Sequence, residues 1–126
     1  MTGCASTVTF KAVDAVTNQP LAGVNTVWRM DSIDFLYITR HHFGPTNLPP
    51  STENGVVVVN GPHKYAASRF IFSRDGYAPV YGIYYNDSMA CAEHIYPALI
   101  GGFNITAPVS YVSPTNGVIV VRMSPQ

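Results

Sequence analysis

The chain has 126 residues, a length typical of one domain around one hydrophobic core, and 47% of its residues are aliphatic or aromatic. Charged residues make up only 11%, and seven basic side chains balance seven acidic ones. This balance argues against a nucleic-acid partner, which needs a clustered basic surface, and against electrostatic binding to anionic lipid. We expect a single domain over residues 1–126 with no membrane span, because no apolar run reaches the ~18 residues of a membrane helix.

The N-terminal part of the chain predicts two strands joined by a firm turn. Residues Thr7–Val13 alternate between apolar and polar side chains, as in a half-buried strand. Pro20 has no N–H to give to a strand ladder, and Gly23 can adopt a backbone conformation closed to other residues. Because Val24–Arg29 again consists of strand-forming residues, we expect a hairpin-like connection between the two strands.

The next segments predict two strands separated by a long connection. Residues Ile33–Thr39 are rich in aromatic and branched side chains, which favours a third strand. The segment Arg40–Gly55 is polar and proline-rich, and loops of this length inside compact domains are often functional. A short, fully apolar strand is expected at Val56–Asn60.

Two further strands are predicted around an Asp75-Gly76 turn, at Tyr65–Ser73 and Val80–Tyr85. The following segment, Asp87–Ile95, contains Ala, Met and Glu, so a short helix is expected there.

Asn116–Met123 is predicted to be the closing strand. About seven short strands separated by turn signals predict an all-β fold, an antiparallel β-sandwich with one long loop and one short helical insertion.

Three segments then follow in an order that resembles the carboxypeptidase regulatory-like domain, a transthyretin-like β-sandwich. They read "VTFKAVDAVTNQPLAGVNT", "STENGVVVV" and "FIFSRDGYAPVY", and the resemblance spans about residues 7–85. Its matching positions are Asp14, Thr17, Pro20, Leu21, Gly23, Val24, Thr52, Gly55, Gly76 and Tyr77. Relative to that family, residues of about 40–55 and 86–116 are insertions. The resemblance implies a folding aid, spacer or adhesive module, and its motif residues mark turns and core contacts.

The sequence contains no recognisable catalytic motif. It lacks G-x-S-x-G, H-E-x-x-H and a phosphate-binding glycine loop, and its acidic residues are scattered, mostly at turns. We therefore expect no catalytic residue and no cofactor. Cys91 and His94 would share one face of the predicted helix, but two ligands are only a fragment of a zinc site. A small hydrolase or metal enzyme is the least favoured class.

Aromatic residues and the two insertions supply the predicted contact surface. Exposed aromatic rings can stack on sugars or anchor a protein interface. Strand alternation would instead bury every second residue, with Tyr81 and Tyr85 on one face and Tyr84 on the other. The predicted interface residues are His41, His42, Phe43, Tyr84, Tyr85, Tyr96 and Phe103.

These features favour a non-enzymatic structural or interaction module in a larger extracellular or particle-surface assembly, such as a virion decoration subunit or a filament subunit. Its partners would be other protein subunits, in a homo-oligomer or a mixed assembly. The alternative is a bacterial cell-envelope lipoprotein domain that binds carbohydrate or another ligand. The segment "TGCA" at Thr2–Ala5 resembles the end of a lipoprotein signal, which would make Cys4 the lipidated residue. A Cys4–Cys91 disulfide is left open.

Overall fold

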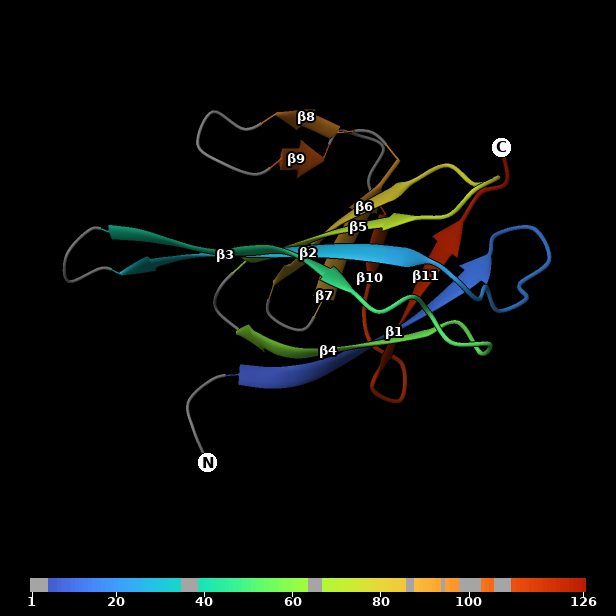
Figure 1. Ribbon diagram of the computed structural model, residues 1–126, viewed down its shortest axis with the longest axis horizontal. Coiled ribbons are helices and arrows are strands. Elements are labelled where there is room, and N and C mark those ends of the chain that lie inside the picture. Colours follow the sequence, from blue (N-terminus) through green and yellow to red (C-terminus); the bar gives the residue numbers. More distant parts are fainter. Residues whose placement is uncertain are drawn as a thin grey trace.

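The computed structural model describes residues 5–34, 39–63, 67–85, 88–93, 95–97, 103–105 and 110–126. Within these residues the regular secondary structure consists of strands, which confirms the predicted all-β class and the β-sandwich (Figure 1). The strands are β1 (Ala5–Asp14), β2 (Asn25–Asp34), β3 (Thr39–Leu48), β4 (Val56–His63), β5 (Ala67–Ser73), β6 (Val80–Tyr85), β7 (Ser88–Ala92), β8 (Ile95–Pro97), β9 (Phe103–Ile105), β10 (Ser110–Val112) and β11 (Val118–Met123).

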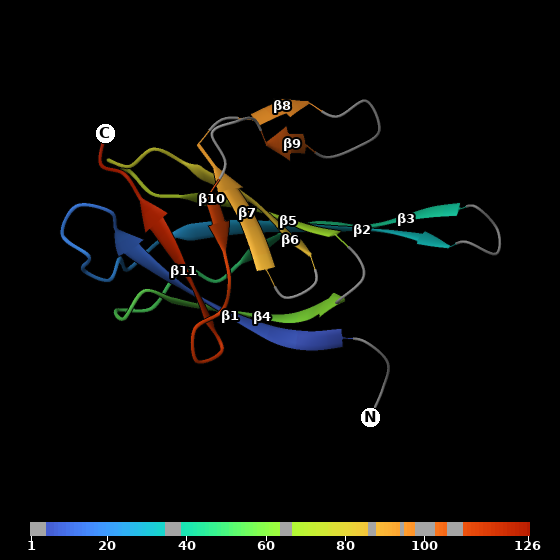
Figure 2. The same cartoon turned by 180° about the vertical axis from the view of Figure 1, so that it is seen from behind.

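The described strands form two facing sheets and a separate pair. The small sheet has the order β11-β1-β4, and the large sheet has the order β10-β7-β6-β5-β2-β3. The pair β8-β9 lies on the side of the large sheet that faces away from the small sheet, as both views show (Figures 1 and 2). The segment of residues 86–116 therefore contributes strands to the large sheet as well as this separate pair.

The core lies between the inward faces of the two sheets and is built around aromatic rings. Phe10 of β1 packs edge-to-face on Phe70 and Phe72 of β5, with ring centroids 4.9 and 5.3 Å apart. Trp28 of β2 stacks on Phe70 at 6.3 Å, and its indole N–H donates to the buried Ser68 hydroxyl at 3.2 Å. The alternation read in β1 places its apolar side chains in this core, as predicted.

The connection between β1 and β2 is not the hairpin that the sequence predicts. Strand β1 belongs to the small sheet and β2 to the large sheet, so the turn around Pro20 and Gly23 carries the chain across the sandwich. Turn residues predict a change of chain direction, but they do not predict which strand the next segment will pair with. One pairing is also parallel: β1 runs alongside β11, with Phe10 opposite Ile119.

The prediction of a loop over Arg40–Gly55 is wrong for its first half, which forms β3 and pairs with β2. Between Trp28 and Met30 the register shifts, so that β3 carries an extra residue at Gly44-Pro45, and Gly44 has a φ of +88°. A bulge of this kind accommodates a glycine with positive φ. Because β3 is an edge strand, a proline without an N–H is tolerated there as well.

The predicted third strand, Ile33–Thr39, begins at the end of β2 and ends at the start of β3; its residues 35–38 lie outside the described part of the chain.

The short helix predicted at Asp87–Ile95 is also wrong, because Ser88–Ala92 is strand β7 between β6 and β10. Met89 is fully buried and packs where Gly82 of β6 has no side chain; a Cβ there would lie 2.7 Å from the Met89 sulfur. Pairing along both edges of β7 outweighs a helix propensity of a few tenths of a kcal/mol per residue. Asp87 itself lies outside the described residues.

Candidate interaction site

The loops at one end of the sandwich are held together by Asp14, at the end of β1. Its carboxylate accepts the N–H groups of Val16 and Thr17 at 2.7 and 2.9 Å and the hydroxyl of Tyr77 at 2.7 Å. The bonds from Thr17, Tyr77 and Val16 hold the pKa of Asp14 below its usual value of 3.8, and Asp14 in turn raises the pKa of Tyr77. Both carboxylate oxygens are engaged, so Asp14 joins two loops and is poorly placed to act as a base.

A second set of contacts joins the turn after β1 to the turn before β4. The Ser51 hydroxyl accepts the N–H of Val24 at 2.8 Å and donates to the carbonyl of Leu21 at 2.7 Å. Gly55 accepts the N–H of Ala12 through its carbonyl at 2.8 Å, and its φ is +77°. We call this end of the molecule, with Asp14, Ser51, Gly55 and Tyr77, the interlocked end. The residues that carry the family resemblance here hold turns in place.

Two of the predicted interface tyrosines, Tyr84 and Tyr85, differ in solvent exposure. Tyr84 is 3% exposed and belongs to the core, so its assignment to an interface is wrong. Tyr85 is 50% exposed on the outer side of the large sheet, as alternation along β6 requires. Sequence reasoning missed Tyr111, which is 81% exposed on β10, because a three-residue strand gives too short a pattern to detect.

The other predicted interface residues are placed by their backbones. His41, His42 and Phe43 lie on the edge strand β3, opposite Ser32, Asp31 and Met30 of β2. Tyr96 and Phe103 lie on β8 and β9, in the pair outside the large sheet. Their side chains are outside the described part of the structure, so their contact role stays a prediction.

The predicted two-ligand metal fragment loses its basis. Cys91 lies on a strand, so the helical spacing that would bring it beside residue 94 does not exist; His94 and Cys4 are outside the described residues. Burial raises the pKa of the free Cys91 thiol to about 11, which keeps it protonated and unreactive at neutral pH. Among the described residues, no group of three or more His, Cys, Asp or Glu side chains could hold a metal ion.

One candidate surface is the outer side of the small sheet. Along β4 and β11 the buried valines and isoleucine alternate with valines that point away from the core. The register places Thr9 between Val58 and Val118, and Lys11 between Val56 and Val120. Val58 is 48% exposed and its neighbours are half-buried. We call these six residues, Thr9, Lys11, Val56, Val58, Val118 and Val120, the valine face.

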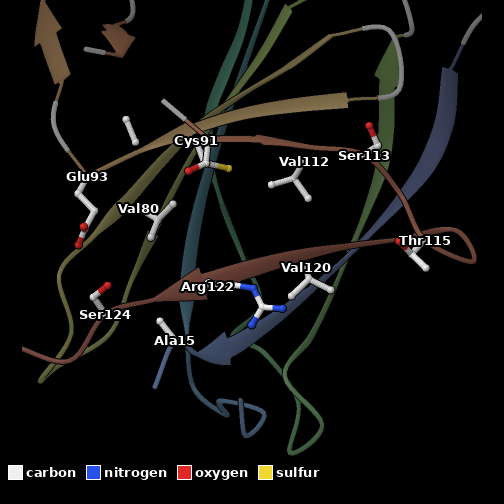
Figure 3. Close-up of a pocket in the computed structure, with 12 residues that line it drawn as sticks. Ala15, Val80, Cys91, Glu93, Val112, Ser113, Thr115, Val120, Arg122 and Ser124 are labelled. Carbon is white, nitrogen blue, oxygen red and sulfur yellow. The ribbon is translucent and has the colours of Figure 1, made fainter. Parts of the chain in front are cut away.

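A second candidate surface arises because the small sheet has three strands and the large sheet facing it has six. Strand β11 contacts β6, and β4 contacts β5, so β7 and β10 extend past the edge of the small sheet. A groove of about 570 Å³ lies between this extension and β11, within the usual size range of a binding site. Figure 3 shows its walls: Cys91 and Val112 from the large sheet, Glu93 just after β7, and Val120 and Arg122 from β11. We call it the edge groove.

The edge groove combines half-buried apolar groups with exposed charges. Val112 and Cys91 are half-buried, whereas Glu93 and Arg122 are exposed to solvent. The Arg122 guanidinium donates one hydrogen bond to the Asn18 side chain. The groove therefore offers apolar contact along its length and one charge of each sign.

In the described residues, no helix has the length and apolar character needed to cross a membrane. No protein-family model matches the chain, and no curated protein matches it. Among solved structures, it is similar to 3-chlorocatechol 1,2-dioxygenase from Rhodococcus opacus 1CP, with 14% sequence identity and a TM-score of 0.45. The match covers 98% of this chain and 60% of that one, so the chain spans less than two thirds of the enzyme's length. No conclusion about enzymatic activity follows from so distant a likeness.

Proposed function

We propose that this protein is a non-enzymatic interaction module, a structural subunit of a larger extracellular or particle-surface assembly. The observation that supports the proposal is the valine face. A sheet with one side in water normally places polar residues on that side, as β1 does with Thr7, Thr9 and Lys11. Its two neighbours β4 and β11 instead present valines outward, and this departure from the usual pattern is what favours the valine face as a contact surface.

The size of the valine face limits what it can do alone. Three strands about 4.8 Å apart and about five residues long cover roughly 14 by 17 Å, or ~240 Å². A standard protein interface buries ~800 Å² on each partner. The valine face therefore serves as one part of a wider contact, which is what a subunit with several neighbours requires.

The titratable groups described above fit this function better than they fit catalysis. The Asp14 carboxylate is used by two backbone N–H groups and by Tyr77, and the Cys91 thiol is held protonated by burial. A nucleophile needs a lowered pKa or an adjacent base. Neither group supports a nucleophilic role.

The experiment is a comparison of two Val→Lys variants by sedimentation across a wide range of protein concentration. Val58→Lys puts a charge in the valine face, whereas Val16→Lys makes the same change on a loop residue that is 79% exposed. We expect wild type and Val16→Lys to self-associate, and Val58→Lys to do so at least ~10-fold more weakly, which corresponds to ~1.4 kcal/mol. Three monomers, or equal association of all three proteins, would refute self-assembly through the valine face.

A carbohydrate-binding module is the second candidate, and two tyrosines favour it. Tyr85 and Tyr111 are both exposed and lie across β7 from one another, opposite Ser88 and Ala90. Exposed aromatic rings offer flat surfaces for sugar stacking. Binding of wild type but not Tyr111→Ala to a glycan array would favour this function. Mass spectrometry of the native N-terminus, showing Met1 or a lipidated Cys4, tests the accompanying envelope prediction.

A further inference from the structure

The edge groove borders the free edge of β11: in the described part of the chain, no strand pairs with β11 on the side away from β1. In a strand, successive residues direct their N–H and C=O groups to opposite sides. The carbonyl of Met123 accepts the N–H of Ala15 at 2.8 Å, on the β1 side. Val121 and Ile119 share this direction, so the backbone groups of Val120 and Arg122 point the other way, into the groove that both residues line.

The open part of this edge is short and has defined ends. The N–H of Val118 donates to the carbonyl of Thr115 at 3.1 Å, and the carbonyl of Val118 accepts the N–H of Thr115 at 2.9 Å. The carbonyl of Ser124 accepts the N–H of Ala78 at 2.9 Å. Between these positions, Val120 and Arg122 present an N–H and a C=O each, a pattern that matches the backbone of one extended peptide.

The shape of the edge groove selects a single strand over a second folded copy. If two copies joined their β11 strands about a two-fold axis, each copy's projecting β7 and β10 would lie on the same side of the joined sheet. The two projections would compete for the same space, because each already extends past its own β11. An extended segment without a second layer of its own meets no such obstacle.

We propose that the edge groove binds an extended segment of a partner protein, which adds to β11 as a fourth strand of the small sheet. This rests on the interaction role proposed above and names its partner class. The segment is about five residues long, because two paired positions and their flanks need no more. Small apolar side chains on one face meet Val112 and Cys91 of the large sheet, and an acidic residue on the opposite face meets Arg122.

The test uses a capped hexapeptide in which three valines alternate with glutamate, threonine and lysine. Two control peptides carry N-methyl groups at alternate residues: the first at residues 1, 3 and 5, the second at residues 2, 4 and 6. Because alternate N–H groups of a strand point to opposite sides, only one of the two peptides loses the N–H groups that face β11. In a ¹H–¹⁵N NMR titration we expect saturable shifts centred on the amides of Val120 and Arg122. Hydrogen exchange at these two amides should slow by at least ~10-fold at saturation.

One control peptide should bind and the other should not. Equal binding of both control peptides would overturn the proposal, as would the absence of saturable shifts or shifts confined to another edge strand such as β3.

Two protein variants test which side chains of the groove contact the peptide. Cys91→Phe fills the groove without changing the β11 edge and should weaken binding at least ~10-fold. Arg122→Glu, at an exposed site, should weaken binding too, and exchanging the peptide's glutamate for lysine should restore it.

The Val58→Lys variant separates the two proposals. It changes the valine face and leaves the groove intact, so it should bind the hexapeptide as wild type does. If the protein does not self-associate but binds the peptide at Val120 and Arg122, the groove proposal stands and self-assembly falls. If the protein self-associates through the valine face but does not bind the peptide, the edge-groove proposal is refuted and the interaction role is supported.

Discussion

The interlocked end and the edge groove lie in one sandwich but differ in how their polar groups are used. At the interlocked end, Asp14 and Ser51 are at most 8% exposed, and their oxygens pair with backbone groups of neighbouring loops. Along the edge groove, the backbone groups of Val120 and Arg122 point away from β1, and no described strand pairs with them. Full pairing produces a rigid end that holds the fold, whereas open pairing leaves an edge for a partner.

The largest expected effect contrasts two glycines with almost the same backbone. Gly55 at the interlocked end has a φ of +77°, and Gly117, in the turn before β11, has a φ of +78°. A Cβ on Gly55 would collide with the carbonyl oxygen of Ala12, whereas a Cβ on Gly117 meets nothing within 4 Å.

We therefore expect Gly55→Ala to lower the free energy of unfolding by ~3 kcal/mol or more, and Gly117→Ala by only ~1 kcal/mol, measured by urea denaturation. Equal losses at the two positions would mean that the interlocked end is no tighter than the turn beside the open edge.

A smaller effect is expected from two serines. Ser51→Ala leaves the N–H of Val24 and the carbonyl of Leu21 without the hydroxyl that joins them, in a site that is 6% exposed. Loss of such buried bonds should lower the free energy of unfolding by ~2 kcal/mol. Ser113→Ala, at an exposed residue of the edge groove, should change it by less than ~0.5 kcal/mol. If both variants unfolded at the same urea concentration, the contrast between the interlocked end and the edge groove would be refuted.

The smallest effect is a pH dependence at the interlocked end. Because the folded-state pKa of Asp14 lies below 3.8, its contribution to stability is complete above that value and is lost as the pH falls through the lower folded-state pKa. The melting temperature of wild type should exceed that of Asp14→Asn at neutral pH, and the two should converge in strong acid. Tyr77→Phe removes only one of the three bonds and should fall between them. Parallel curves for wild type and Asp14→Asn would show that Asp14 contributes nothing through its charge.

Local patterns predicted parts of the fold and of the candidate surfaces well. Alternation in β1 identified its buried face, and alternation in β6 separated Tyr84 from Tyr85. The same reasoning failed at β3, where glycine and proline indicated a loop although an edge strand tolerates both through a bulge. It failed again at β7, where helix-favouring residues became a strand because neighbours pair along both of its edges.

The sequence by itself determined the class of the protein: strands of alternating apolar residues, turns at its glycines and prolines, and a chain with little charge. These properties depend on neighbours along the chain, so a local pattern is enough to read them. Only the tertiary structure decided that β11 runs parallel to β1, that three strands face six, and that Val120 and Arg122 stand beside an open groove. Those facts depend on which distant segments pair, and pairing is set by the packing of the whole core.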